Sequence, residues 1–177
     1  EQEEAKVILA EQQKKMNDLD SIMAQKSATI KSYEQSEAKY EQLIASNEKA
    51  SKQVEQLINQ AMASSDSGGT VYTGGKLNWP VPARSASSSS LSSGFVSRNR
   101  PIGKGTEFHT GYDIPAPYGS NIVAAEGGRV IYSGWMSGYG YTIMIDHGGG
   151  LVTLYGHNSK LVVSKGTTVT RGQVVAK

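Results

Sequence analysis

The chain has 177 residues, and its content of 37% hydrophobic and 19% charged residues excludes a collagen, a membrane-spanning chain and a fully disordered chain. It contains no cysteine, which excludes disulfides, thiolate metal ligands and cysteine nucleophiles. The formal charge of +2 is the sum of −3 over residues 1–62, −1 at Asp66 and +6 over residues 76–177.

The basic C-terminal half suits an anionic polymer as partner, which could be nucleic acid, anionic lipid or bacterial cell wall. Only two tryptophans are present, and no run of Lys or Arg exceeds two residues. We therefore expect no nucleic-acid partner.

Residues 1–63 are predicted to form a coiled-coil helical region. All 20 glycines lie after residue 67, and glycine is costly inside a helix. A series with alternating spacings of three and four residues runs through this segment, and eleven of its sixteen members are apolar, as in a coiled-coil seam. The members are Leu9, Gln12, Met16, Leu19, Met23, Lys26, Ile30, Tyr33, Glu37, Tyr40, Ile44, Asn47, Ser51, Val54, Ile58 and Ala61.

This region is either one long helix or a helical hairpin that turns at Asn17-Asp18 or Ser46-Asn47. Its apolar stripe needs a partner, because a helix this polar is not stable alone. Two interpretations stay open. The helix is a spacer or dimerisation rod, or it is a regulatory arm that docks on a partner or covers a site.

Residues 64–75 are predicted to be a flexible linker, since they are rich in serine and glycine. In residues 76–177, short β-branched runs alternate with glycine turns, which predicts a mostly antiparallel all-β domain. The fold class is therefore α+β. The expected strands are Tyr112–Ile114, Asn121–Ala125, Gly128–Trp135, Tyr141–Asp146, Leu151–Tyr155 and Gln173–Ala176.

The chemistry of the β domain must come from few groups, among them an H-x-x-x-D spacing at His109 and Asp113. In a straight strand these two side chains would lie ~13 Å apart, at ~3.3 Å per residue. Thr110-Gly111 permits a bend that brings them together. Imidazole plus carboxylate is a suitable first half of a catalytic zinc site, although the two residues could also form a simple hydrogen-bonded pair.

From about residue 75 onward the sequence resembles the lysostaphin/LytM-type zinc peptidases that cut peptidoglycan. The order and spacing of several pieces carry this resemblance. They are Leu77-Asn78-Trp79-Pro80-Val81-Pro82, Ser93-Gly94-Phe95, Arg100-Pro101-Ile102, Phe108-His109-Thr110-Gly111-Tyr112-Asp113-Ile114, Ala124-Ala125-Glu126-Gly127-Gly128-Arg129-Val130, Ile145-Asp146-His147-Gly148, Leu154-Tyr155-Gly156-His157, Lys165-Gly166 and Arg171-Gly172-Gln173.

The resemblance implies that His109 and Asp113 are zinc ligands and that His157 is a catalytic histidine beside the metal. If zinc needs three protein ligands, His157 could instead be the third one. It could also be a structural histidine at the surface. His147 is expected to be structural, and Tyr112 is expected to pack in the core. The family's third ligand lies in a later His-x-His strand, and the sequence given stops at Lys177. We therefore expect residues 1–177 to lack the C-terminal strand and to be inactive, in contrast to a longer parent protein.

The expected function is a zinc-dependent peptidoglycan endopeptidase that hydrolyses peptide cross-links of the bacterial wall, with no small-molecule cofactor besides Zn²⁺. The expected location is extracytoplasmic, in the cell envelope or secreted. The coiled coil suggests tethering, self-association or control by a membrane partner in cell division. Two alternatives remain, namely a non-catalytic LytM-type activator of a wall amidase and a coiled-coil scaffold with a wall-binding module.

Overall fold

The computed structural model describes residues 2–63, 72–100 and 105–177. Its residues divide into two compact units, one that ends at Ala45 and one that runs from Ser46 to Lys177. The predicted linker of residues 64–75 lies largely outside the described residues, and the predicted boundaries at residues 63 and 75 stay predictions. Within the described part of the chain, no helix has the length and hydropathy of a membrane span.

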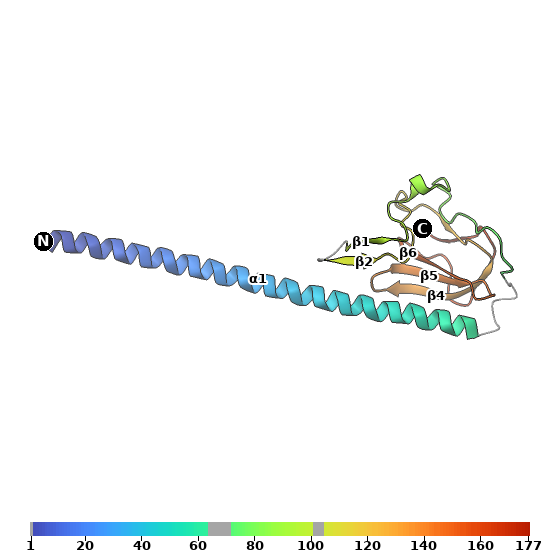
Figure 1. The fold of residues 1–177 in the computed structure, drawn as a ribbon, viewed down its shortest axis with the longest axis horizontal. Coiled ribbons are helices and arrows are strands. Elements are labelled where there is room, and N and C mark those ends of the chain that lie inside the picture. The colour runs from blue at the N-terminus through green and yellow to red at the C-terminus, as the bar shows by residue number, and fades with distance from the viewer. Residues whose placement is uncertain (1, 64–71, 101–104) are drawn as a thin grey trace. The chain divides into compact units, whose positions relative to one another are not determined.

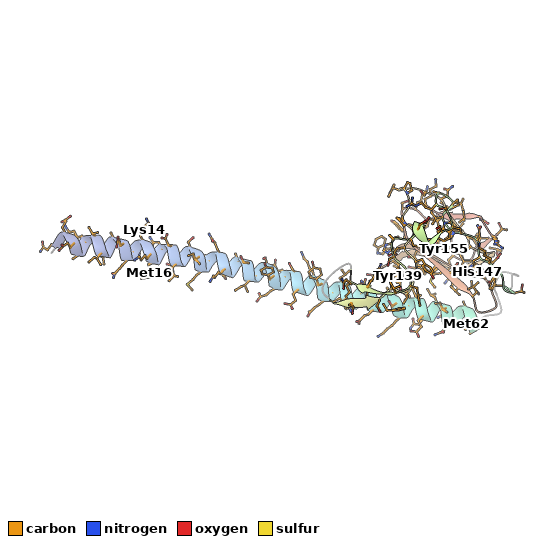
Figure 2. The ribbon with its side chains drawn as sticks, turned by 45° about the horizontal axis from the view of Figure 1, so that its top comes forward. Lys14, Met16, Met62, Tyr139, His147 and Tyr155 are labelled. Atoms are coloured by element: carbon orange, nitrogen blue, oxygen red, sulfur yellow. The ribbon has the colours of Figure 1, made fainter. Side chains whose placement is uncertain are left out.

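Helix α1 spans Gln2–Ala63 without interruption (Figure 1). No glycine or proline occurs within it, so nothing in its backbone chemistry forces a turn. Asn17-Asp18 and Ser46-Asn47 both lie inside α1, so the long helix is confirmed and a hairpin is not formed. In the first unit its side chains project outward, as Lys14 and Met16 do in Figure 2.

The last turns of α1 belong to the second unit and pack on its strands. Ala50 and Ala61 are buried, and Val54, Leu57 and Ile58 are half-buried. These positions recur every three or four residues, so they form one face of the helix. The division between the units therefore lies inside α1, near the point at which the helix begins to pack on the strands.

Among its described residues, the second unit holds a short 3₁₀ turn, η1, and eight strands, all paired antiparallel. The elements are η1 (Ser88–Ser90), β1 (Ser97–Asn99), β2 (Thr106–Phe108), β3 (Ile122–Val123), β4 (Gly128–Met136), β5 (Gly140–Asp146), β6 (Val152–Asn158), β7 (Thr168–Val169) and β8 (Val174–Ala176). One four-stranded sheet has the order β6-β5-β4-β7, and β1-β2 and β3-β8 form two-stranded ribbons. The predicted α+β class, with an antiparallel β domain, is confirmed.

The longest predicted strands agree with β4, β5 and β6, but the strand predicted at Tyr112–Ile114 is wrong. Only an isolated bridge forms there, between Ser93 and Asp113. Tyr112 is also not a core residue, because 65% of its surface is exposed. After the bend at Gly111, the backbone pairs at the single position Asp113, which is too little for a strand.

The core lies between the four-stranded sheet and the β3-β8 ribbon. Strand β5 contributes Ile143 and Ile145, both fully buried, and β4 contributes Val130. The remaining members are Ala124, Ala125, Tyr155, Val169, Val175 and Ala176. Small alanines beside β-branched residues allow the ribbon to approach the sheet closely.

A buried polar network joins the turn after β5 to this core. The His147 ring is fully buried, its Nδ1 donates to the Gly127 carbonyl at 2.7 Å, and its Nε2 lies 2.8 Å from Thr153 Oγ1. Thr153 Oγ1 is also hydrogen-bonded to Tyr155 Oη, which accepts the Ala125 N–H, both at 2.8 Å. Figure 2 shows His147 and Tyr155 within the strand region. The structural role expected for His147 agrees with this satisfied, enclosed ring.

The network depends on the absence of a side chain at Gly128. A Cβ at this position would collide with the carbonyl oxygen of Asp146 and lie 2.9 Å from His147 Nδ1. Gly128→Ala should therefore destabilise the chain by about 3 kcal/mol in denaturant unfolding, because neither the backbone nor the enclosed ring can move away.

Gly134→Ala, in the same strand, is the matched control. Its Cβ would meet only the flexible end of Tyr132, at 3.3 Å, so its cost should stay below about 1 kcal/mol. Equal losses for the two variants would contradict the proposed close approach.

Tyr155 makes the stability of this domain sensitive to alkaline pH. Burial raises the pKa of its phenol above the ordinary value, against smaller opposing effects of the hydrogen bonds with Thr153 and Ala125. A raised folded-state pKa means that this contribution is fully present below about pH 10 and is lost as pH rises through the folded pKa.

Tyr155→Phe should accordingly lose less unfolding free energy than wild type as pH rises above about 10. The control Tyr118→Phe changes a side chain that is 93% exposed and should keep the wild-type loss. An unchanged alkaline loss in Tyr155→Phe would exclude the phenol as its source.

Candidate metal centre

One segment of backbone anchors both candidate ligands. The His109 N–H donates to the Val96 carbonyl at 2.8 Å, and the Asp113 N–H donates to the Ser93 carbonyl at 2.9 Å. Between the ligands the chain bends at Gly111, as the sequence predicted. The bend brings together side chains that a straight strand would hold apart.

The imidazole of His109 has a defined orientation. Its Nδ1 lies 2.9 Å from the Gly94 carbonyl and 3.2 Å from Ser93 Oγ. A carbonyl oxygen only accepts hydrogen bonds, so Nδ1 carries the proton, and in the neutral ring Nε2 carries the lone pair. Metal-binding histidines commonly donate from one ring nitrogen to a carbonyl in this way, which fixes the tautomer and leaves the other nitrogen for the metal.

The lone pair of His109 faces a carboxylate. Nε2 lies 3.4 Å from Asp113 Oδ1, and the side chains are 16% and 40% exposed. Two lone-pair atoms at this distance repel each other unless a proton or a metal ion lies between them. Zinc bonds of ~2.0–2.1 Å at a tetrahedral angle separate two ligand atoms by about 3.4 Å. The pair therefore fits two positions of a zinc ion's coordination sphere.

Arg98 holds the other oxygen of the same carboxylate. Its Nη1 donates to Asp113 Oδ2 at 2.7 Å and to Ser93 Oγ at 3.0 Å, while its Nε donates to Glu107 Oε1 at 3.0 Å. Arg98 and Glu107 are cross-strand partners in the β1-β2 ribbon. Hydrogen bonding to Asp113, and then to Glu107, raises the pKa of the Arg98 guanidinium, so its charge is permanent.

His157 lies on β6 and is exposed. Its φ of 56° is the one positive φ among the described non-glycine residues, and its N–H donates to the Tyr139 carbonyl at 2.7 Å. A non-glycine residue in this region is strained and is often found at functional sites. Within the described residues no group of three His, Cys, Asp or Glu side chains converges on one metal position. The structure thus pairs His109 with Asp113 and does not add His157 as a third ligand.

Sequence reasoning assigned no role in the site to Arg98. The available signal was a basic and an acidic residue, Arg98 and Glu107, each at the centre of a short extended run. The sequence does not reveal that these two runs pair, or in which register. Ser93 was missed for the same reason. Both residues contact the candidate ligands directly.

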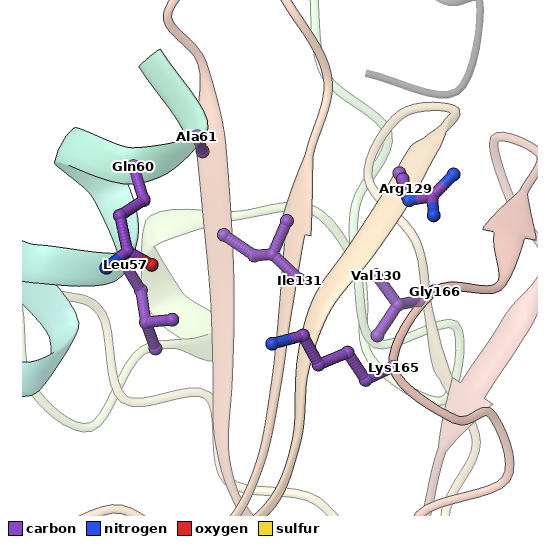
Figure 3. A pocket seen from close by; sticks show the side chains of 8 residues that line it. All are labelled: Leu57, Gln60, Ala61, Arg129, Val130, Ile131, Lys165 and Gly166. Carbon is purple, nitrogen blue, oxygen red and sulfur yellow. The ribbon is translucent and has the colours of Figure 1, made fainter. Parts of the chain in front are cut away.

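A separate pocket lies where the end of α1 meets β4 (Figure 3). It is lined by Leu57, Gln60, Ala61, Arg129, Val130, Ile131, Lys165 and Gly166. None of these is a histidine or a carboxylate, and two are cationic. This pocket therefore offers no ligands to a metal cation.

The pairing of His109 with Asp113 invites comparison with known proteins. Residues 107–177 match the model of Peptidase family M23. This stretch is therefore similar to M23 domains of the LytM type. The resemblance in the sequence is thus confirmed, and the matched stretch includes His109, Asp113 and His157.

Two curated relatives are similar to parts of this chain. Murein hydrolase activator EnvC of Escherichia coli (strain K12) is 41% identical over 66 residues, which are 37% of this chain and 16% of the relative. DD-carboxypeptidase/endopeptidase Mpg of Neisseria gonorrhoeae is 38% identical over 85 residues, which are 48% of this chain and 20% of the relative. The match thus spans a fifth or less of the length of these relatives.

Among solved structures, Helicobacter pylori Csd3 in its orthorhombic crystal is similar to this chain. The sequence identity is 34%, the TM-score is 0.48, and the match covers 58% of this chain and 28% of that one.

The contacts of Arg98 predict a positioning role that zinc binding can test. Arg98→Met should weaken the zinc affinity of the chain by about 10- to 100-fold, because Asp113 would lose the partner that orients it. The measurement is competition with a chromophoric chelator.

Arg100→Met is the matched control, since among the described residues the Arg100 side chain is hydrogen-bonded to the Thr106 carbonyl, at 3.4 Å, and not to Asp113. It should leave the affinity unchanged. Arg98→Lys keeps the positive charge but lacks the guanidinium group that donates to Asp113 and Glu107 at the same time. It should therefore restore only part of the zinc affinity that Arg98→Met loses. Equal affinities of Arg98→Met and wild type would show that Asp113 does not depend on Arg98.

Proposed function

We propose that this domain is a zinc-dependent peptidoglycan endopeptidase that hydrolyses peptide cross-links of the bacterial cell wall. The observation that carries the proposal is the separation of His109 Nε2 from Asp113 Oδ1 by 3.4 Å within an M23 domain. The relative Mpg, named a DD-carboxypeptidase/endopeptidase, supports peptide-bond hydrolysis as the reaction.

His109 and Asp113 are the residues that would hold the metal. When bound, a zinc ion supplies a Lewis acid that polarises a carbonyl group and activates water. The Nδ1 hydrogen bond of His109 to Gly94 keeps the ring in the tautomer that presents Nε2. Arg98 fixes the carboxylate so that Oδ1 stays directed toward that nitrogen.

His157 is proposed to carry a proton at its exposed imidazole during hydrolysis. An imidazole titrates near neutral pH, which suits a general acid or base. Its left-handed backbone, at φ of 56°, is held by the hydrogen bond from its N–H to the Tyr139 carbonyl in the β4-β5 turn. This strain directs the side chain of a β6 residue away from the regular pleat of the strand.

Two ligands are fewer than the three that a catalytic zinc site normally uses. For residues 1–177 we therefore propose weak zinc binding and no hydrolysis of peptidoglycan. Zinc-dependent hydrolysis by this chain would contradict that ligand count.

A second candidate function is the activation of a separate murein hydrolase. The observation that favours it is the 41% identity to the activator EnvC. The arrangement of His109 and Asp113 favours the enzyme, because an activator has no need of a preserved metal-ligand pair. Zinc content separates the two functions.

Peptidoglycan lies outside the cytoplasmic membrane, so we propose an extracytoplasmic location in the cell envelope. The basic charge of the M23 domain would attract it to an anionic wall, which affects encounter rate more than specificity. The helix is proposed to tether or regulate the domain, for example through a partner at the division site.

The test uses the protein as its gene encodes it, with zinc content and release of soluble fragments from purified peptidoglycan as the two measurements. His109→Ala should lose both zinc and hydrolysis, because it removes a ligand. His157→Ala should keep zinc and lose hydrolysis by about 10²- to 10⁴-fold, because it removes only proton transfer.

Zinc content that His109→Ala leaves unchanged would overturn the metal assignment. A zinc-free wild type that releases no fragments, but stimulates an added amidase, would replace the endopeptidase with the activator.

A further inference from the structure

Within the residues that the structure describes, the apolar stripe of α1 is covered in only one of its two parts. In the second unit, its members Val54, Ile58 and Ala61 are half-buried or buried against the strands. In the first unit, the members of the same series are exposed. The exposed fractions are 53% for Leu19, 61% for Met23, 57% for Ile30, 71% for Tyr33, 50% for Tyr40 and 44% for Ile44.

The exposed part continues the covered part with the same alternating spacing of three and four residues. The stripe that packs on the domain is thus one half of a longer apolar face. Long polar helices with such a face are stable only when a second surface covers it. A second helix covers a face of this spacing by knobs-into-holes packing.

Two charged residues interrupt the exposed stripe, and they distinguish the candidate arrangements. They are Lys26 and Glu37. In a parallel dimer in register, Lys26 would face Lys26 of the second copy and Glu37 would face Glu37. Like charges brought together in a dehydrated seam are costly.

An antiparallel dimer centred between Lys31 and Ser32 removes this conflict. In that register, Lys26 faces Glu37 of the second copy, and the reverse pair forms by symmetry. A two-fold axis makes every contact reciprocal, so one charge pair in the sequence becomes two in the dimer.

The same register also aligns every apolar member of the stripe between residues 19 and 44. Ile30 faces Tyr33, Met23 faces Tyr40, and Leu19 faces Ile44 of the second copy. The charge pairs and the apolar pairs are thus satisfied by one alignment. The two sets of pairs coincide because the series of spacings from Leu19 to Ile44 is symmetric about its centre.

Positions beside the stripe modify this preference only slightly. Ile22 would lie near Leu43 of the second copy, which extends the apolar contact. Asp20 would lie near Glu41 of the second copy, and this like-charge contact disfavours the antiparallel dimer. In a parallel dimer, Lys15 would lie near Asp20 of the second copy, which favours that arrangement. Exposed pairs of this kind contribute at most a few tenths of a kcal/mol to 1 kcal/mol, so they do not outweigh charges inside the seam.

We propose that residues 19–44 form an antiparallel coiled coil with a second copy of this chain, in the register that pairs Lys26 with Glu37. The occupant is a second copy because one sequence supplies both members of each pair. The proposal does not depend on the catalytic function of the M23 domain.

Charge exchange tests the orientation directly. Sedimentation equilibrium of the full chain should show a dimer. Lys26→Glu and Glu37→Lys should each weaken the dimer by about tenfold or more, since each places like charges in the seam. The double variant K26E/E37K should restore the wild-type dissociation constant to within about threefold.

Lys39→Glu, on the opposite side of the helix from the stripe, is the matched control and should leave the dissociation constant unchanged. Circular dichroism of each variant checks that the helix is retained. Because the chain has no cysteine, cross-linking gives an independent measurement. A mixture of Lys26→Cys and Glu37→Cys should form a mixed disulfide dimer, while Lys26→Cys alone should not cross-link.

Three results would overturn the proposal. They are a wild type that stays monomeric at all accessible concentrations, single charge variants that dimerise as well as wild type, and a Lys26→Cys variant that cross-links with itself. The last two would indicate a parallel alignment.

Discussion

One guanidinium determines the geometry of the candidate metal centre. Arg98 binds Glu107 across the β1-β2 ribbon and Asp113 from the following bend. Asp113 is therefore held by one oxygen, and its other oxygen faces the imidazole of His109 at 3.4 Å. Without a fixed cation on one side, the carboxylate could turn away from the histidine and hydrogen-bond elsewhere.

This arrangement separates structural from chemical roles among similar residues. His109 and His147 both donate from Nδ1 to a backbone carbonyl. The Nε2 of His147 is satisfied by Thr153 in a fully buried network, whereas the Nε2 of His109 faces a carboxylate oxygen in a partly open position. The two rings therefore differ in the contact of Nε2. Only the Nε2 of His109, of these two, is placed to bind a metal ion.

The sequence was sufficient for the features that depend on local chemistry and regular spacing. The absence of glycine and the apolar series predicted α1, and the long β-branched runs predicted β4, β5 and β6. The bend at Gly111 was predicted because only a bend could bring His109 to Asp113. Strands β1, β2 and β7 were not predicted, because each has only two or three residues and is stabilised by its partner strand. Strands β3 and β8 are equally short but lie within predicted runs.

Long-range register was beyond sequence reasoning. Arg98 reaches Asp113 only because β1 pairs with β2 in one particular alignment, and neither residue's own neighbours reveal it. The left-handed backbone of His157 likewise depends on a hydrogen bond to the β4-β5 turn. The end of α1 packs on strands far away in sequence, which moved the boundary between the compact units into the helix.

The central claim is that His109 Nε2 and Asp113 Oδ1 together bind a metal ion. Nitrogen-15 NMR of the imidazole rings during a zinc titration tests it most directly, because it observes each histidine nitrogen without requiring catalysis. We predict that the Nε2 resonance of His109 shifts on zinc addition, that its Nδ1 stays protonated, and that Asp113→Ala abolishes the shift. A titration in which His109 does not respond, or responds equally without Asp113, would contradict the account.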